Sequence, residues 1–135
     1  MMNDLIDTSL ELAAENAGDI TFAIYEQYYL LCPDAKPLIE TVDLGVQGKM
    51  IQEVMRLIML SDYVGEANYL KFEVKCHKTS FSVEGHMYSL LLQAVYLVVK
   101  DAIKDVVDWD QTFEEAWQQR INDLLGEIET VEAAI

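Results

Sequence analysis

The sequence is poor in the residues that cross-link, bend or break a polypeptide chain. It contains two cysteines, two prolines and six glycines among 135 residues. Two cysteines exclude a disulfide framework and favour a reducing, cytoplasmic compartment. Because 52% of the residues are hydrophobic, a disordered or fibrous chain is also excluded. The length predicts one domain, residues 1–135, large enough for a hydrophobic core.

Positive charge is scarce. Nine lysines and arginines stand against 24 acidic residues, which gives a formal net charge of −15. Nucleic acids and anionic membranes are bound largely through Lys and Arg, so this charge argues against both as partners. A solvated acidic surface is the common explanation of such a charge, and attraction to a basic partner protein is the other.

Long apolar runs and familiar catalytic motifs are missing. Arg56, Gln93 and Lys100 interrupt the longest apolar stretches, so none is long enough to predict a membrane span. Residues 1–4 contain no basic segment ahead of an apolar one, and we therefore expect no signal peptide. The chain has no glycine-rich phosphate loop, and no cysteine or histidine pair has the spacing typical of a zinc site.

Helical periodicity is abundant. Apolar residues recur at intervals of three and four over most of the chain, which predicts an all-α fold. The predicted helices are 8–17, 20–32, 46–60, 69–80, 86–99 and 111–129, with a single helical turn at 33–40. Asp7 or Thr8 is the predicted cap of the first helix, and Asp19 and Asp110 are those of the second and the last. The apolar run 90–99 could be a strand by periodicity alone, but its length and flanking charges favour helix.

A basic, polar segment separates two of these apolar helices. It covers residues 75–88 and contains both histidines, His77 and His86. We expect a helix to end near Ser80, a corner at 82–85 and a new helix after it. A neutral imidazole at the end of a helix, facing an apolar wall, can ligate a metal through one ring nitrogen. A core or surface histidine without a metal is the more common alternative for an isolated His77.

Six or seven helices with one buried histidine in mid-chain are typical of globins. The most specific stretches are His77-Lys78-Thr79-Ser80-Phe81-Ser82-Val83-x-x-x-x-Tyr88 and Asp108-Trp109-x-x-x-Phe113-x-x-Ala116-Trp117. In these stretches the chain resembles the bacterial single-domain globins and the haem domain of flavohaemoglobins, with a likeness that extends over about residues 10–129. The resemblance implies a globin fold, six to eight helices around a haem pocket, with haem b (iron protoporphyrin IX) as the cofactor.

The resemblance also implies roles for individual residues. His77 matches the proximal histidine that binds the haem iron, and Val83 matches the corner residue that packs on the haem face. Tyr25 and Gln47 match polar residues of the distal side, where the gaseous ligand binds. Ile51 lies one helical turn beyond Gln47 and matches the apolar residue beside that ligand.

Three further positions follow from the same resemblance. Tyr88 is similar to a tyrosine that forms a hydrogen bond on the proximal side in flavohaemoglobin-like globins, and Glu129 or Glu132 could be its glutamate partner. Ile39 stands where the family has a phenylalanine stacked on the haem, so the pocket is expected to close with an aliphatic residue. Tyr25 has an alternative role as an ordinary core residue of an aromatic-rich helix.

The function implied by the resemblance is reversible binding of a diatomic gas, O2, NO or CO, for transport, storage or detoxification. Nitric oxide dioxygenation would need a separate reductase, because the chain contains no flavin or nicotinamide domain. A haem-free or haem-sensing globin-fold module that regulates a partner is the alternative, and Ile39 favours it. His86 resembles a frequent surface histidine and is expected to face solvent. The sequence does not determine the oligomeric state, and a homodimer is one alternative.

Overall fold

The fold is built from helices. The structure, a computed structural model, describes residues 2–60, 62–81 and 83–135, and no strand occurs among them. The elements are α1 (Met2–Ala17), α2 (Thr21–Leu31), the 3-10 turn η1 (Pro33–Ala35), α3 (Lys36–Ile39), α4 (Leu44–Met59), α5 (Ala67–Phe81), α6 (Gly85–Ile103) and α7 (Gln111–Ala133). The all-α prediction is confirmed. The same residues hold no helix that could span a bilayer, given the length and apolarity that a span requires.

Short acidic side chains account for where two of the helices begin. The Asp43 carboxylate accepts hydrogen bonds from the backbone N–H groups of residues 45 and 46, at 2.9 and 3.3 Å. The Asp110 carboxylate does the same for residues 112 and 113, at 3.0 and 3.1 Å. These bonds satisfy N–H groups for which the first helical turn has no partner. The predicted cap at Asp110 is therefore confirmed.

The predicted start of the first helix is wrong. Asp7 and Thr8 lie inside α1, which already begins at Met2. Ile6 is fully buried, so packing of this early turn against the rest of the fold extends the helix upstream of the first clear polar residues. The predicted end is correct, since Gly18 adopts a left-handed backbone conformation with φ of 71° directly after the helix.

The two connections next to the basic segment also agree with the sequence. The first connection was predicted at residues 61–68 and lies between the end of α4 at Met59 and the start of α5 at Ala67. The corner was predicted at residues 82–85 and lies between the end of α5 at Phe81 and the start of α6 at Gly85. Met1, Ser61 and Ser82 lie outside the described residues. Ser61 and Ser82 belong to the two predicted connections, and Met1 belongs to the prediction for the chain start. At the corner the Val83 N–H donates to the His77 carbonyl at 3.1 Å, which closes the end of α5.

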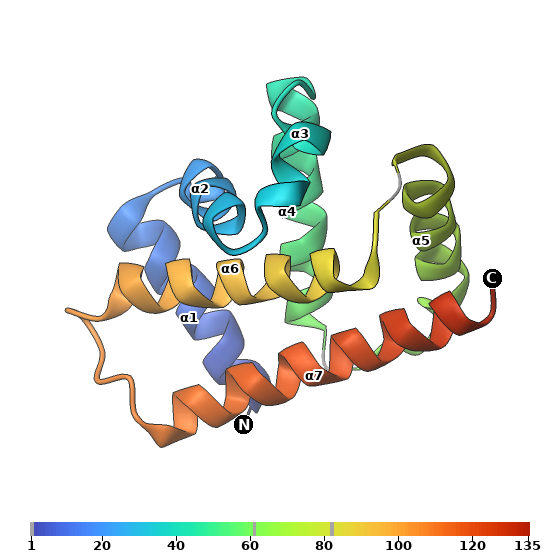
Figure 1. Cartoon of the computed structure of the whole chain (residues 1–135). Coiled ribbons are helices and arrows are strands. Elements are labelled where there is room, and N and C mark those ends of the chain that lie inside the picture. The colour runs from blue at the N-terminus through green and yellow to red at the C-terminus, as the bar shows by residue number, and fades with distance from the viewer. Residues whose placement is uncertain (1, 61, 82) are drawn as a thin grey trace.

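Helix α6 is the central element (Figure 1). It packs on α1, α2 and α7, while α5 packs on α7 at the far end of the molecule. Trp117 of α7 is fully buried and donates through its indole N–H to the Ser9 hydroxyl of α1 at 3.2 Å. The Ser9 hydroxyl donates in turn to the Leu5 carbonyl at 2.6 Å. The buried hydroxyl of Ser9 and the indole N–H of Trp117 are therefore paired, as burial requires.

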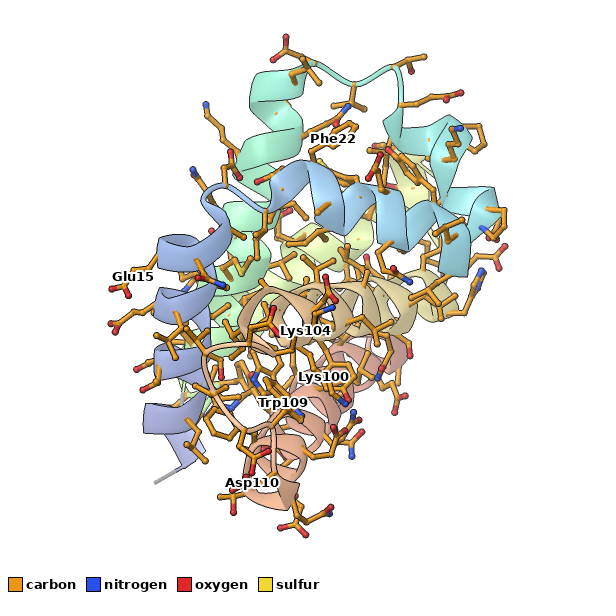
Figure 2. The ribbon with its side chains drawn as sticks, turned by 90° about the vertical axis from the view of Figure 1, so that its left-hand side faces the viewer. Glu15, Phe22, Lys100, Lys104, Trp109 and Asp110 are labelled. Carbon is orange, nitrogen blue, oxygen red and sulfur yellow. The ribbon has the colours of Figure 1, made fainter. Side chains whose placement is uncertain are left out.

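One carboxylate joins α6, α7 and the segment between them. Glu114 accepts hydrogen bonds from the Tyr96 hydroxyl at 2.6 Å and the Trp109 indole N–H at 3.0 Å. It also accepts from the Gln118 amide at 3.2 Å and the Lys100 ammonium at 3.3 Å. Lys100 and Trp109 lie together at this connection (Figure 2), with the ammonium 5.7 Å from the indole centroid. Burial alone would raise the pKa of Glu114, but these hydrogen bonds outweigh it and lower that pKa to about 2.

Candidate functional site

Two apolar cavities lie next to each other between α4, α5 and α6. Their volumes are about 260 Å³ and 290 Å³. The residues that line both are Val46, Met50, His77, Tyr88 and Leu91. The His77 side chain therefore borders two hollow spaces at once, close to the end of α5.

The first cavity is enclosed mainly by aliphatic and aromatic side chains. Its walls come from α2, the corner around α3, α4, the end of α5 and the start of α6. The residues that line this cavity alone are Tyr25, Tyr28, Ala35, Leu38, Ile39, Val42, Val83 and Met87. The predicted places of Tyr25, Ile39 and Val83 on a common pocket wall with His77 agree with this arrangement.

The second cavity lies between α4, α5 and α7. Its additional walls include Val54, Leu70, Leu124 and other apolar residues, together with the charged residues Lys49, Glu53 and Glu73. An apolar hollow with a few charged groups at its wall is the usual form of a small-molecule site.

Tyr88 is a polar neighbour of His77 across the corner. Its hydroxyl lies 3.4 Å from Nδ1 of the imidazole, and the two rings meet edge to face with centroids 6.3 Å apart. Burial raises the pKa of Tyr88 to about 12, and the carboxylates of Glu132 and Glu73 act in the same direction. The phenol is therefore neutral near pH 7. The sequence predicted a glutamate as the partner of Tyr88, and the structure places its hydroxyl beside the imidazole of His77.

The glutamate partner of Tyr88 can now be chosen between the two candidates. Glu132 is half-buried, and its carboxylate would lie 3.4 Å from a Cβ placed on Gly85, at the start of the helix that holds Tyr88. Glu129 is exposed. Of the two candidates, Glu132 is thus the carboxylate that lies near Tyr88.

Tyr25 is a buried core residue that also borders a cavity. It is only 4% exposed, as a core residue would be, and it lines the first cavity. Its hydroxyl donates to the backbone carbonyl of Gln47 at 2.8 Å. Burial, followed by the neighbouring Tyr29, raises the pKa of Tyr25 to about 12, so this phenol also keeps its proton.

The predicted register of α4 needs correction. Neither Gln47 nor Ile51 lines the two cavities. The Gln47 amide donates to the carbonyls of Ile39 and Val42 at 3.1 and 2.8 Å, so its side chain closes the corner before α4. Ile51 is buried on a different side of α4, against a hollow bordered by α1 and the start of α2.

Val46 and Met50 are the residues of this part of α4 that line both cavities. Each residue along a helix turns the side chain by about 100°, so an error of one position changes the face it presents. The error arose because the count across the corner at 41–45 depends on a loop whose length the sequence pattern does not determine. Val46 and Met50 belong to the same apolar stripe of the sequence, and this stripe was the sequence pattern that could have identified them as lining residues.

Tyr28 and Met87 are lining residues that no sequence pattern singled out. The Tyr28 hydroxyl donates to the Met87 carbonyl at 2.9 Å, and this bond ties α2 to α6 across 59 residues of sequence. Desolvation by burial is the largest cause that raises the pKa of Tyr28, so its hydroxyl remains a donor. Such a bond is visible only once the two helices are in contact.

Comparison with protein-family models gives no match for this chain, and comparison with curated proteins gives none either.

Proposed function

We propose that the chain is a globin-like protein that binds haem b between α4, α5 and α6, with His77 as the ligand of the iron and O2 or NO as the gas it takes up. One observation carries the proposal. The imidazole of His77 borders two apolar cavities at once, and the hydroxyl of Tyr88 lies 3.4 Å from its Nδ1. A histidine placed in this way is an uncommon feature of an ordinary hydrophobic core.

The residues present suit a porphyrin. Aliphatic and aromatic side chains line both cavities, as an apolar macrocycle requires, and the cavities share one wall. Lys49 on the wall of the second cavity is a cation that can pair with a porphyrin carboxylate. The arrangement of the helices also supports a globin-type fold, since α4 and α5 border the second cavity and the long α6 and α7 complete its wall (Figure 1).

Tyr88 would position the imidazole. When Nε2 of His77 faces the metal, Nδ1 carries the proton and donates to the Tyr88 oxygen, which selects this tautomer and raises the basicity of the ligating nitrogen. The neutral phenol favours this role because it can accept that proton and still donate its own. Tyr88 is thus a positioning residue.

On the other side, Tyr25 provides a hydroxyl donor, while Val46 and Met50 add apolar surface to the wall of the first cavity. Haem supplies an iron atom that binds O2, NO or CO. Reversible gas binding is the activity that these side chains support directly. Nitric oxide dioxygenation needs an electron donor, which we assign to a separate reductase.

A haem-free globin-fold module is the second candidate. The observation in its favour is the corner at Leu38, Ile39 and Val42, which covers the first cavity with aliphatic side chains and no aromatic ring. An aliphatic cover still buries apolar surface at about 25 cal/mol per Å². What it lacks is the aromatic contact, worth roughly 0.5–1.5 kcal/mol by analogy with aromatic pairs, and this is too little to abolish haem binding.

The two candidates separate in one experiment. The purified protein is mixed with hemin, and its visible spectrum is recorded before and after reduction and addition of CO. We expect a Soret band that shifts with CO in the wild type, and loss of haem or of the histidine-ligated spectrum in His77→Ala. Lys78→Ala, which changes an exposed side chain next to His77 on the same helix, is the control and should keep the wild-type spectrum. A folded protein that takes up no hemin, or a His77→Ala variant with an unaltered spectrum, would refute the proposal.

A further inference from the structure

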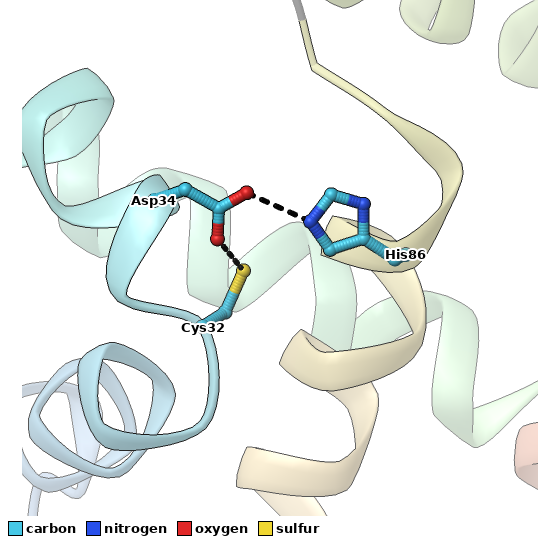
Figure 3. Close-up of side chains that lie close together, drawn as sticks. All are labelled: Cys32, Asp34 and His86. Carbon is cyan, nitrogen blue, oxygen red and sulfur yellow. Dashed lines mark hydrogen bonds and ion pairs between the residues drawn. The ribbon is translucent and has the colours of Figure 1, made fainter.

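Three side chains with metal-ligating atoms meet outside the two cavities (Figure 3). Cys32 directly follows α2, Asp34 lies in η1, and His86 is in the first turn of α6. One Asp34 oxygen lies 3.0 Å from the Cys32 sulfur, and the other lies 2.8 Å from Nε2 of His86. The sequence contained no sign of this cluster, because 52 residues separate Asp34 from His86. His86, expected to face solvent, is half-exposed and paired.

The geometry of the cluster suits a small tetrahedral ion. A sulfur, a carboxylate oxygen and an imidazole nitrogen all lie within 4.8 Å of one another. Bonds of about 2.0–2.3 Å to a tetrahedral zinc ion would hold such atoms roughly 3.3–3.7 Å apart, so only small side-chain movements are needed. Bonds from the ligands to the ion would replace the present hydrogen bonds of Asp34 with Cys32 and His86.

A fourth side chain orients the imidazole in the manner of a metal site. One Glu84 oxygen lies 3.4 Å from Nδ1 of His86, on the ring nitrogen that does not face Asp34. Histidine ligands of metals commonly donate their second N–H to a carboxylate, which fixes the tautomer and presents the other nitrogen to the ion. Glu84 is therefore an outer partner, and Nε2 is the ligating atom.

We propose that Cys32, Asp34 and His86 form a Zn²⁺ site that fastens the end of α2 and η1 to the start of α6. A thiolate, an imidazole and a carboxylate together are ligands that zinc accepts, and water completes the coordination. Cys32 is 1% exposed, whereas the side chains of Asp34 and His86 are 57% and 44% exposed, so solvent reaches the site from one side. Binding releases the thiol proton of Cys32 to solvent, one proton for each ion bound when His86 is neutral.

The site would act on the wall of the first cavity. Ala35 follows Asp34 directly, Met87 follows His86, and both residues line that cavity. An ion that joins η1 to α6 therefore holds two parts of the cavity wall together. The proposal does not depend on haem, since none of the three ligands lines either cavity.

Equilibrium dialysis of the full chain against Zn²⁺, after removal of metals with a chelator, tests the proposal. We expect one zinc ion per chain by metal analysis. X-ray absorption at the zinc edge should show one sulfur at about 2.3 Å and nitrogen or oxygen neighbours at about 2.0–2.1 Å. This measurement is insensitive to bound haem, so the outcome for zinc and the outcome for hemin are read separately.

Substitutions locate the ion. Glu84→Gln should weaken zinc binding roughly 10- to 100-fold, as expected for an outer partner, and Cys32→Ser, Asp34→Asn and His86→Gln should weaken it further. The matched controls are Cys76→Ser, which removes the other thiol, and Asp101→Asn, which removes an exposed carboxylate paired with Lys104. Asp34→Asn and His86→Gln alter half-exposed side chains and keep the test valid even if Cys32→Ser unfolds. Equal affinity in the wild type and these two variants, or a zinc edge without a sulfur neighbour, would overturn the proposal.

Discussion

Replacement of Glu114 by glutamine is the sharpest test of how the structure holds α6 and α7 together. The carboxylate accepts hydrogen bonds from Tyr96, Trp109, Gln118 and Lys100, which come from α6, from the segment before α7 and from α7 itself. Glu114→Gln keeps the size and one acceptor oxygen but removes the charge. Hydrogen bonds to a charged acceptor are roughly twice as strong as those between neutral groups, so the variant should be less stable.

The size of the effect follows from the pKa. Hydrogen bonds overcome the cost of burial and lower the pKa of Glu114 from its ordinary 4.5 to about 2. At 1.36 kcal/mol per pKa unit, this difference corresponds to about 3 kcal/mol of folding free energy at neutral pH. Because the side chain is 29% exposed and water screens part of the charge, we expect a loss of about 2 kcal/mol in Glu114→Gln.

The pH dependence has a definite sign. The folded-state pKa lies below the ordinary value, so the charged carboxylate favours the folded chain. Its contribution is present in full above about pH 4.5 and is lost as the pH falls toward about 2. The difference in unfolding free energy between the wild type and Glu114→Gln should therefore shrink over that interval.

Urea denaturation followed by circular dichroism at several pH values measures this difference. Glu115→Gln is the matched control, because Glu115 is the exposed next residue of the same helix and loses the same charge. We expect the control to change the unfolding free energy by less than about 0.5 kcal/mol, as surface substitutions usually do. Equal effects of the two substitutions at pH 7, or a difference for Glu114→Gln that does not vary with pH, would refute the reasoning.

Two further predictions concern the corner and the distal wall. In Tyr25→Phe the rate of O2 release should rise roughly 2- to 30-fold. In the wild type the Tyr25 hydroxyl gains a bond to O2 worth roughly 1.5–3 kcal/mol but gives up its bond to the Gln47 carbonyl, worth about 1 kcal/mol. An unchanged rate in flash photolysis would contradict this prediction. Gln47→Leu should lower the unfolding free energy by about 1–2 kcal/mol, since it removes the donors to the carbonyls of Ile39 and Val42. Gln52→Leu, an exposed change on the same helix, is its control, and equal losses in urea denaturation would contradict the assignment.

Features that depend on neighbouring residues were predictable. The last helix shows this clearly, since its predicted apolar stripe contains Trp117, Ile121, Leu124 and Ile128, and all four are buried in the structure. The cap at Asp110 was equally local, because a carboxylate reaches only the N–H groups of the next two or three residues. The corner between His77 and Tyr88 was predictable in the same way, because residues 82–85 interrupt the helical pattern.

Features that depend on the rotation and contact of whole helices were not predictable. The pattern of α4 contained Val46, Met50 and Ile51 in one apolar stripe, yet the first two face the cavities and Ile51 faces α1. The first helix began earlier than its polar residues suggested because burial of Ile6 outweighed local capping preferences.

The sequence by itself determined the helical class of this protein, most of its helix ends and the position of His77 near a corner. These properties arise from side-chain periodicity and from hydrogen bonds within one helical turn. Only the tertiary structure decided which face of each helix borders the two cavities, and only it brought Cys32, Asp34 and His86 together. The physical reason is that these arrangements come from packing between helices distant in the chain, where the burial of apolar side chains sets the rotation of each helix.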